Sequence, residues 1–258
     1  MKVQFKRFFS VDSPKAIKAD KYGYLNAINY MAPHTSGGIG NLCASASPGC
    51  IDLCLGEHSG QAAMVSRETG TNAVRESRKR KAQFFANDIQ GYMDECCHHI
   101  ERLVIRAAKM GRKLCVRMNG ATDIPYERIK IKSRGNRNIF DAFPHVQFVD
   151  YTKRFERLGK VPANLHLTFS RSETNERWCD LALDRGHNVA VVFAGDFPAT
   201  WHGAQVIDGD AHDLRHLDPK GSPTNRGYVI GLSPKGNRAK RDTSGFVVRD
   251  ASSIALAA

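Results

Sequence analysis

Short apolar runs alternate with helical patterns along most of this chain, and no other feature restricts its fold as much. Apolar residues recur every three or four positions between Ser66 and Met110, which predicts a helix in two pieces that ends at Gly111. A further helix is predicted within 171–186. The runs rich in apolar and β-branched residues are predicted strands, and they cover 24–33, 113–120, 146–152, 164–170, 187–195, 204–209 and 227–233.

Helices placed between buried strands indicate a parallel sheet, because each crossover helix covers a face of that sheet. The last predicted strands lie too close together for full helices between them, so a complete eightfold repeat is not expected. We therefore predict an α/β protein with a partial or irregular (β/α) barrel and a cysteine-rich loop after the first strand. No low-complexity linker interrupts residues 1–258, which predicts a single domain over that range.

Polar side chains follow the predicted strands at their carboxyl ends, where ligands bind in α/β sheets and barrels. Each of these residues has an ordinary alternative role, since Asn, Asp and Ser also cap helices and form turns. As a set they predict one pocket. The candidate catalytic residues are Asn119, Asp123, Asp150, Lys153, Ser170 and Glu173. The other polar residues at these ends are Tyr151, Arg171, Asp196, Asp208, Asp210 and Asp213.

Three of the seven cysteines lie within twelve positions, with the spacing Cys43-x6-Cys50-x3-Cys54. Their thiolates can converge on a [4Fe-4S] cluster, because a loop that contains Gly49 and Gly56 can fold closely around it. That arrangement leaves one iron open to a small ligand. Zinc needs four ligands, and His58 would be the fourth beside these three cysteines. In the third hypothesis the thiols only pack as small hydrophobic groups.

The segment "CCHH" at 96–99 also invites a metal hypothesis. Neighbouring residues on a helix point about 100 degrees apart, however, so these four side chains cannot all face one ion. We expect Cys96 and Cys97 to belong to the helix core. Cys115 and Cys179 are expected to be buried as well.

The chain has no apolar run of the roughly 18 residues that a membrane span needs, and its start lacks the apolar core of a signal peptide. We therefore expect no membrane association and a cytoplasmic location. In a reducing compartment disulfides are the least expected use of the cysteines.

The formal net charge is +12, from 38 basic and 26 acidic residues. This excess attracts polyanions and makes nucleic acid a candidate partner, although solvated surface charge explains it equally well. The densest basic stretches are 75–81, 128–137 and 234–241.

Several specific segments resemble the uncharacterised bacteriophage "gene product 88" domain family. They are "NLCASASPGCIDLCL", "VRESRKRKAQFF", "RAAKMGRKLCVRMNGATDIPYE", "FVDYTKR", "HLTFSRSE" and "GLSPKGNRAKRDTSGFVV". The resemblance spans most of the chain. It implies a phage or prophage origin and a shared, unassigned activity, and it supplies no catalytic residues.

A looser likeness is to radical S-adenosylmethionine enzymes, which also place a three-cysteine loop after the first strand of an α/β barrel. Their usual cysteine spacing is x3 then x2, and their Gly-Gly-Glu after the second strand is replaced here by Asn119-Gly120. The likeness implies that Cys43, Cys50 and Cys54 ligate a cluster. It also implies that polar strand ends, including Asn119, Gly120 and Asp208, bind S-adenosylmethionine and substrate.

Two functional classes follow. The first is an iron-sulfur enzyme whose three thiols share a cavity with Asn119, Asp150 and Ser170. The second is a non-catalytic, basic nucleic-acid-binding phage protein with a structural zinc or cluster loop. The oligomeric state cannot be deduced from the sequence. The ending "SSIALAA" (252–258) resembles the tag that bacteria add to stalled chains for proteolysis, although a frayed tail is the ordinary alternative.

Overall fold

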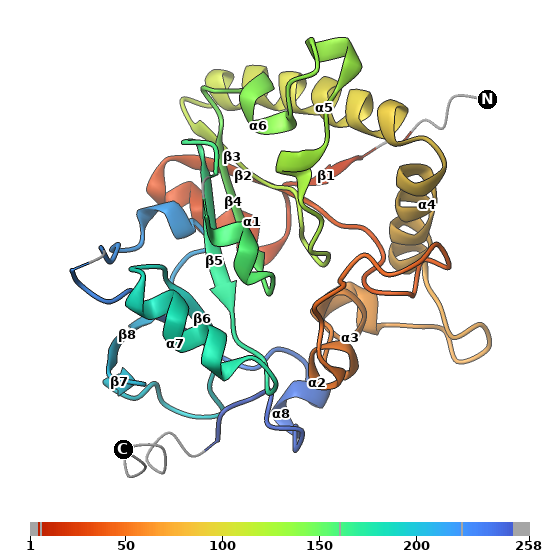
Figure 1. The fold of residues 1–258 in the computed structure, drawn as a ribbon. Coiled ribbons are helices and arrows are strands. Elements are labelled where there is room, and N and C mark those ends of the chain that lie inside the picture. Colours follow the sequence, from red (N-terminus) through yellow and green to blue (C-terminus); the bar gives the residue numbers. More distant parts are fainter. Residues whose placement is uncertain (1–4, 6, 160, 223, 250–258) are drawn as a thin grey trace.

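The structure is a computed structural model that describes residues 5, 7–159, 161–222 and 224–249 (Figure 1). The ending 252–258, with its resemblance to a degradation tag, lies outside the described residues.

The strands of the described residues form one nine-stranded sheet in the order β1-β2-β3-β4-β5-β6-β9-β8-β7. Their bounds are β1 (Phe9–Ser10), β2 (Tyr24–Asn29), β3 (Lys113–Arg117), β4 (Gln147–Thr152), β5 (Leu165–Ser170), β6 (Val189–Val192), β7 (Thr200–Trp201), β8 (Ala204–Asp208) and β9 (Val229–Leu232). The seven strands from β2 to β8 in this order pair in parallel, whereas β1 and β7 pair antiparallel at the edges.

This topology confirms a mixed α/β protein with a mostly parallel sheet. The sheet is not closed into a barrel, because β1 and β7 end it on opposite sides and do not pair with each other. Insertion of β9 between β6 and β8 also departs from the simple sequential order that runs from β2 to β6.

Helices connect and cover these strands. The α-helices are α1 (Pro14–Lys18), α2 (Pro48–Asp52), α3 (Leu55–His58), α4 (Ala73–Asn87), α5 (Ile89–Lys109), α6 (Ile139–Ala142), α7 (Glu176–Asp184) and α8 (Asn237–Lys240). Short 3-10 helices are η1 (Ala19–Tyr22), η2 (Gly60–Ala63), η3 (Tyr126–Arg128), η4 (Lys132–Arg134), η5 (Phe155–Leu158) and η6 (Arg215–Leu217). Within the described residues, no helix combines the length and the apolar composition that crossing a membrane requires.

The predicted two-piece helix corresponds to α4 and α5, which are separated at Asp88. The Asp88 carboxylate accepts a hydrogen bond of 2.8 Å from the Gly91 amide, so Asp88 caps the first turn of α5. The buried face of α5 includes Cys96 and Cys97, which are 0% exposed, so the core explains both cysteines as expected.

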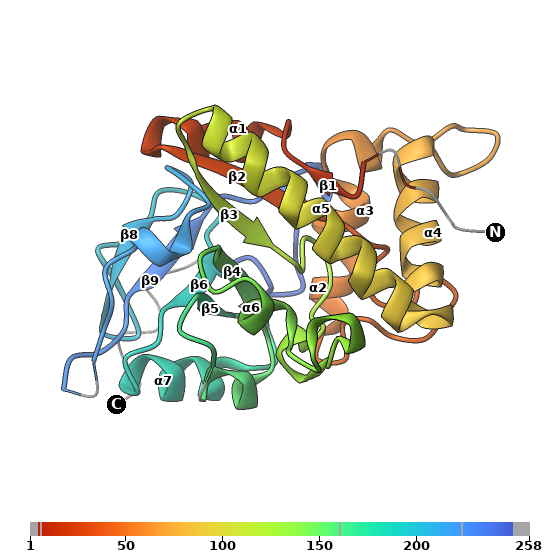
Figure 2. The same cartoon turned by 90° about the horizontal axis from the view of Figure 1, so that it is seen from above.

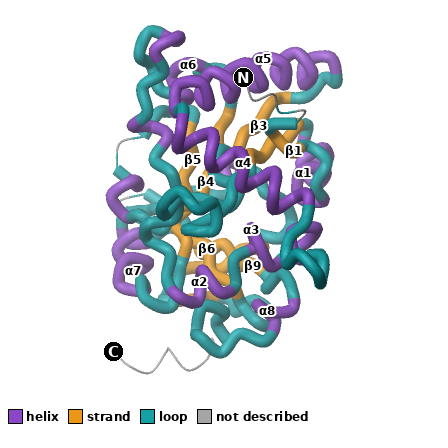
Figure 3. The backbone as a smooth tube through the Cα atoms, turned by 90° about the vertical axis from the view of Figure 1, so that its right-hand side faces the viewer, coloured by secondary structure: helices purple, strands orange, loops and turns teal. Residues whose placement is uncertain are grey.

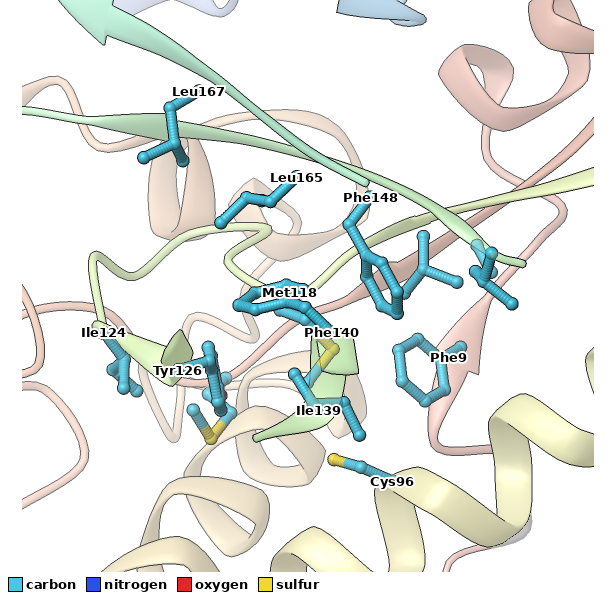
Figure 4. Close-up of a cluster of buried hydrophobic side chains, with 14 of the residues drawn as sticks. Phe9, Cys96, Met118, Ile124, Tyr126, Ile139, Phe140, Phe148, Leu165 and Leu167 are labelled. Carbon is cyan, nitrogen blue, oxygen red and sulfur yellow. The ribbon is translucent and has the colours of Figure 1, made fainter. Parts of the chain in front are cut away.

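The main core lies on the face of the sheet covered by α5, α6 and α7. Figure 2 shows α5 running across this face over β3. Phe148 and Leu165 from neighbouring strands meet Ile139 and Phe140 of α6 in this core (Figure 4). A well-packed apolar face of this kind supplies most of the stability of an α/β layer.

The opposite face of the sheet is covered differently. A smaller cluster of Cys115, Val149, Leu214 and Ala19 lies here, and η6 packs against β4 and β5. At the carboxyl ends of the strands this face is covered by α2, α3 and α8, which lie on the side that faces the viewer in Figure 3. These short helices and the strand ends enclose the cavity described next.

Candidate functional site

A cavity lies at the carboxyl ends of the parallel strands, on the face opposite the main core. Its volume is about 210 Å³. One wall comes from the cysteine segment and contains Cys43, Cys50, Cys54 and Gly56. The facing wall comes from strand ends and the segments after them. Its polar residues are Arg117, Thr122, Asp123, Tyr151, Thr152, Lys153, Ser170, Arg171, Asp210, Ser233 and Lys235.

The three clustered cysteines are free thiols that share this cavity. Burial raises the pKa of Cys43 to about 11 and the pKa of Cys54 to about 12, and the neighbouring thiols add to both shifts. Cys43 is also tied to the facing loop, since its sulfur accepts from the His34 amide and donates to the Ala121 carbonyl. Both raised pKa values mean that these thiols become thiolates at neutral pH only when a cation binds them.

Glu173 holds the helix that carries Cys50. Its carboxylate accepts hydrogen bonds of 2.7 Å from the Ser47 hydroxyl and of 2.7 Å from the Gly49 amide, at the start of α2. A Cβ at Gly49 would lie 2.9 Å from this carboxyl group, so only glycine permits the contact. Glu173, a predicted catalytic residue, thus positions the cysteine segment and is not among the residues that line the cavity.

Two arginines of α4 hold the other end of the cysteine segment. Arg78 donates to the Gly56 carbonyl and stacks 4.7 Å from the centre of the Tyr30 ring. Arg75 donates to the Glu57 carbonyl at 2.7 Å. Both carbonyls belong to α3, directly after Cys54, so the two guanidinium groups satisfy backbone acceptors that a four-residue helix leaves unpaired.

The sequence analysis did not assign this role to the basic stretch 75–81. Its residues Arg75, Arg78 and Lys81 recur every three positions, and this spacing places them on one face of a helix. The face turns inward, and Lys81 is only 6% exposed. The exposed cations of the stretch are Lys79 and Arg80.

Asn119 and Asp150 form a buried pair behind the cavity wall rather than in it. Each is 1% exposed, and the Asp150 carboxylate accepts hydrogen bonds from the Asn119 side chain at 2.8 Å and from its backbone amide at 3.1 Å. Asn119 also bonds Thr122 and Ile124, which fixes the turn after β3. Gly120, predicted to bind a cofactor, lines the cavity and donates its amide to the Asn29 carbonyl.

Asp123 reaches the edge of the cavity, but its carboxylate is committed to other groups of the chain. It accepts from the Thr152 hydroxyl, the Lys153 amide and the Arg157 guanidinium, the last at 2.6 Å. Arg157 is completely buried and also pairs with Glu127. This arrangement joins the loop after β3 to the end of β4.

Lys153 and Ser170 are predicted catalytic residues that line the cavity, as Asp123 does, and they contact each other. Lys153 directly follows β4, and Ser170 ends the neighbouring parallel strand β5. The Lys153 ammonium donates a hydrogen bond of 2.7 Å to the Ser170 hydroxyl. Arg117 lies on the same wall, 4.6 Å from the centre of the Tyr151 ring. Sequence analysis did not select Arg117, although it ends β3 two residues before Asn119.

Two predicted ligands lie away from the cavity lining. Asp208 is exposed and accepts from the Asp210 amide, and Asp210 itself lines the cavity and pairs with Lys235 at 2.9 Å. His58 also lies outside the lining residues. Across the described parts of the chain, no group of three or more His, Cys, Asp or Glu side chains is arranged to hold a metal ion.

The family model described as Gene product 88 matches residues 7–250. No curated protein and no solved structure matches the chain. The looser likeness to radical S-adenosylmethionine enzymes therefore has no support from these comparisons. The matched range covers the sheet, the cysteine segment and the facing wall of the cavity, and the chain belongs to the Gene product 88 family.

Proposed function

We propose that this chain is an iron-sulfur enzyme, which holds a [4Fe-4S] cluster at Cys43, Cys50 and Cys54 and acts on a ligand in the adjoining cavity. The observation that carries the proposal is that all three thiols line one wall of a cavity whose other wall is formed by polar strand ends. Carboxyl ends of parallel strands are the usual ligand site of α/β proteins.

The position of His58 favours a cluster over a single zinc ion. Zinc draws four ligands around one ion, whereas the thiolates of a cluster each bind a different iron and stand further apart. Cys43, Cys50 and Cys54 share a wall of the cavity, and the neighbouring thiols add to the raised pKa values of Cys43 and Cys54. His58, the fourth ligand of the zinc hypothesis, does not line the cavity.

When bound, such a cluster supplies one iron without a protein ligand, at which a small molecule such as S-adenosylmethionine can bind, and it exchanges single electrons. The chain's own residues prepare the site. Glu173 fixes the start of α2, and Arg75 and Arg78 fix α3. The Arg78 guanidinium also lies within electrostatic reach of Cys54, where it favours the thiolate.

The test is metal content after anaerobic reconstitution with iron and sulfide. We expect about four iron and four sulfide per chain in the unaltered protein, together with brown charge-transfer absorbance. Cys43→Ala, Cys50→Ala and Cys54→Ala should each remove most of the iron.

Cys96→Ala and Cys97→Ala are the matched controls, because they remove a thiol from the core of α5. They should keep the iron content of the unaltered protein. Equal iron in all five variants, or stoichiometric zinc with no iron in the unaltered protein, would overturn the proposal.

A further inference from the structure

We propose that the cavity binds an organic anion whose carboxylate or phosphate group is held by Lys153 and Ser170 and whose apolar body lies against β6, β9 and Phe246. This inference rests on the proposed function in that it names the substrate class of the same cavity.

Lys153 has an ammonium group that the chain itself leaves available. Its Nζ donates to the Ser170 hydroxyl, and across the described ranges no carboxylate lies within ion-pairing distance of it. The Lys153 ammonium also lies 5.4 Å from the centre of the Phe246 ring. An ammonium group has three donors, so one bond to a hydroxyl leaves capacity for an anionic ligand.

The other cations of the cavity wall already have partners in the chain. Arg171 donates to the Gly245 and Phe246 carbonyls and pairs with Glu176 at 2.5 Å. Lys235 pairs with Asp210. Arg117 donates to the Asn119 carbonyl and lies 3.9 Å from Asp150. Among the described lysines and arginines of the wall, Lys153 is thus the one without a carboxylate partner.

The surroundings of Lys153 define the rest of the ligand. Ala190, Val192, Leu232 and Phe246 line the cavity and form an apolar surface. Lys153 also lies within electrostatic reach of Cys43 on the facing wall. A ligand with its charge at Lys153 and its apolar body against these residues therefore spans the strand-end wall and lies close to the thiols.

The experiment measures the binding of three probes by titration calorimetry at low ionic strength: phenyl phosphate, phenylacetate and uncharged benzyl alcohol. We expect at least one of the two anions to bind. Lys153→Met should weaken that binding about tenfold to hundredfold, as expected for loss of a charge-assisted hydrogen bond. Whichever anion binds more tightly identifies the group as a phosphate or a carboxylate. Benzyl alcohol should bind both proteins equally.

Lys113→Met is the matched control, since Lys113 is an exposed lysine at the opposite end of β3. It should change anion affinity by less than about twofold, because exposed single charges contribute little. Lys153→Arg keeps the positive charge and should keep measurable affinity for the anion. This result would show that substitution at this position does not itself disrupt the cavity. Failure of both anions to bind the unaltered protein, or equal affinity in Lys153→Met, would refute the anion site.

Iron content is measured on the same preparations, which separates this inference from the proposed function. Anion binding that depends on Lys153 in a protein that takes up no iron leaves the anion site standing and overturns only the cluster. Normal iron content with anion affinity unchanged by Lys153→Met overturns only the anion site.

Discussion

Asp150 shows how a polar residue at a strand end can be enclosed in the fold. It lies on the same side of β4 as Phe148, because alternate residues of a strand share a face, and this side faces the main core. Burial raises its pKa from 3.8 to about 6, although Arg117, Arg157 and the Asn119 hydrogen bond act in the opposite direction.

This raised pKa predicts a specific pH dependence of stability. Between pH 3.8 and about 6 the folded chain keeps a proton on Asp150 that the unfolded chain has released, so the free energy of unfolding falls as the pH rises. Asp150→Asn should abolish this fall, which amounts to roughly 3 kcal/mol at most. Urea unfolding of both proteins across this pH range measures the difference in slope. Parallel curves would show that Asp150 ionises in the folded chain as it does in the unfolded one.

The same alternation explains which candidate site residues the sequence could identify. Tyr151 of β4 and Lys153 directly after it line the cavity, whereas Asp150 lies on the core face of the strand and does not. Strand polarity correctly indicates the end at which polar residues gather. It does not indicate the face, and for this reason Asn119 and Asp150 were grouped with the cavity although they lie behind its wall.

At the scale of elements, α3 depends on α4 for its position. A helix of four residues has little stability of its own, because nucleation is costly and few internal hydrogen bonds form. Arg75 and Arg78 compensate by donating to its carbonyls. Gly56 allows this helix to approach the loop after β3, since a Cβ there would lie 2.7 Å from that of Ala121.

Arg78→Met should therefore loosen the segment that carries Cys54. We expect alkylation of Cys54 by iodoacetamide in the metal-free protein to accelerate about tenfold or more, because loss of a hydrogen bond from a charged donor costs about 1.5–3 kcal/mol. Peptide mass spectrometry after timed labelling measures this rate. Arg80→Met, an exposed arginine of the same helix, is the control and should leave the rate unchanged. Equal rates in both variants would contradict a role of Arg78 in holding α3.

The longer elements were predictable from the sequence because their signals are local. The apolar runs correctly indicated β2 to β6, β8 and β9, and the apolar periodicity correctly indicated α4, α5 and α7. The edge strands β1 and β7 have only two residues each, too few to form a pattern. Sheet closure and the place of β9 depend on contacts between distant segments, which local patterns do not encode.

At the scale of the whole molecule, the positive charges behind the net charge of +12 are not equally accessible in the different basic stretches. Arg75, Arg78 and Lys81 are used inside the fold. In the stretch 128–137, Arg128, Lys130, Lys132 and Arg137 are exposed. This stretch is the better candidate for contact with the phosphates of a nucleic acid.

The alternative function as a nucleic-acid-binding protein is tested at these residues. Changing Lys130 and Lys132 to Gln should lower the slope of log affinity against log salt by about 2, since each phosphate contact releases about one counterion. Changing Lys109 and Lys113, two exposed lysines elsewhere, removes the same charge and should lower the slope less. Fluorescence titration with duplex DNA at several salt concentrations measures the slopes. Identical slopes in the two double variants would assign the stretch 128–137 to ordinary solvated surface.

The position of β9 between β6 and β8 also affects the order in which the sheet can form during synthesis on a ribosome. The strands from β2 to β6 can pair in the order in which they are synthesised. By contrast, β8 pairs with the two-residue β7 but cannot join the rest of the sheet until β9 follows it. Lys235 and Phe246, which complete the cavity, are made later still. During translation the segment with Cys43, Cys50 and Cys54 is therefore open on its cavity side, and access to these thiols is greatest before the chain is finished.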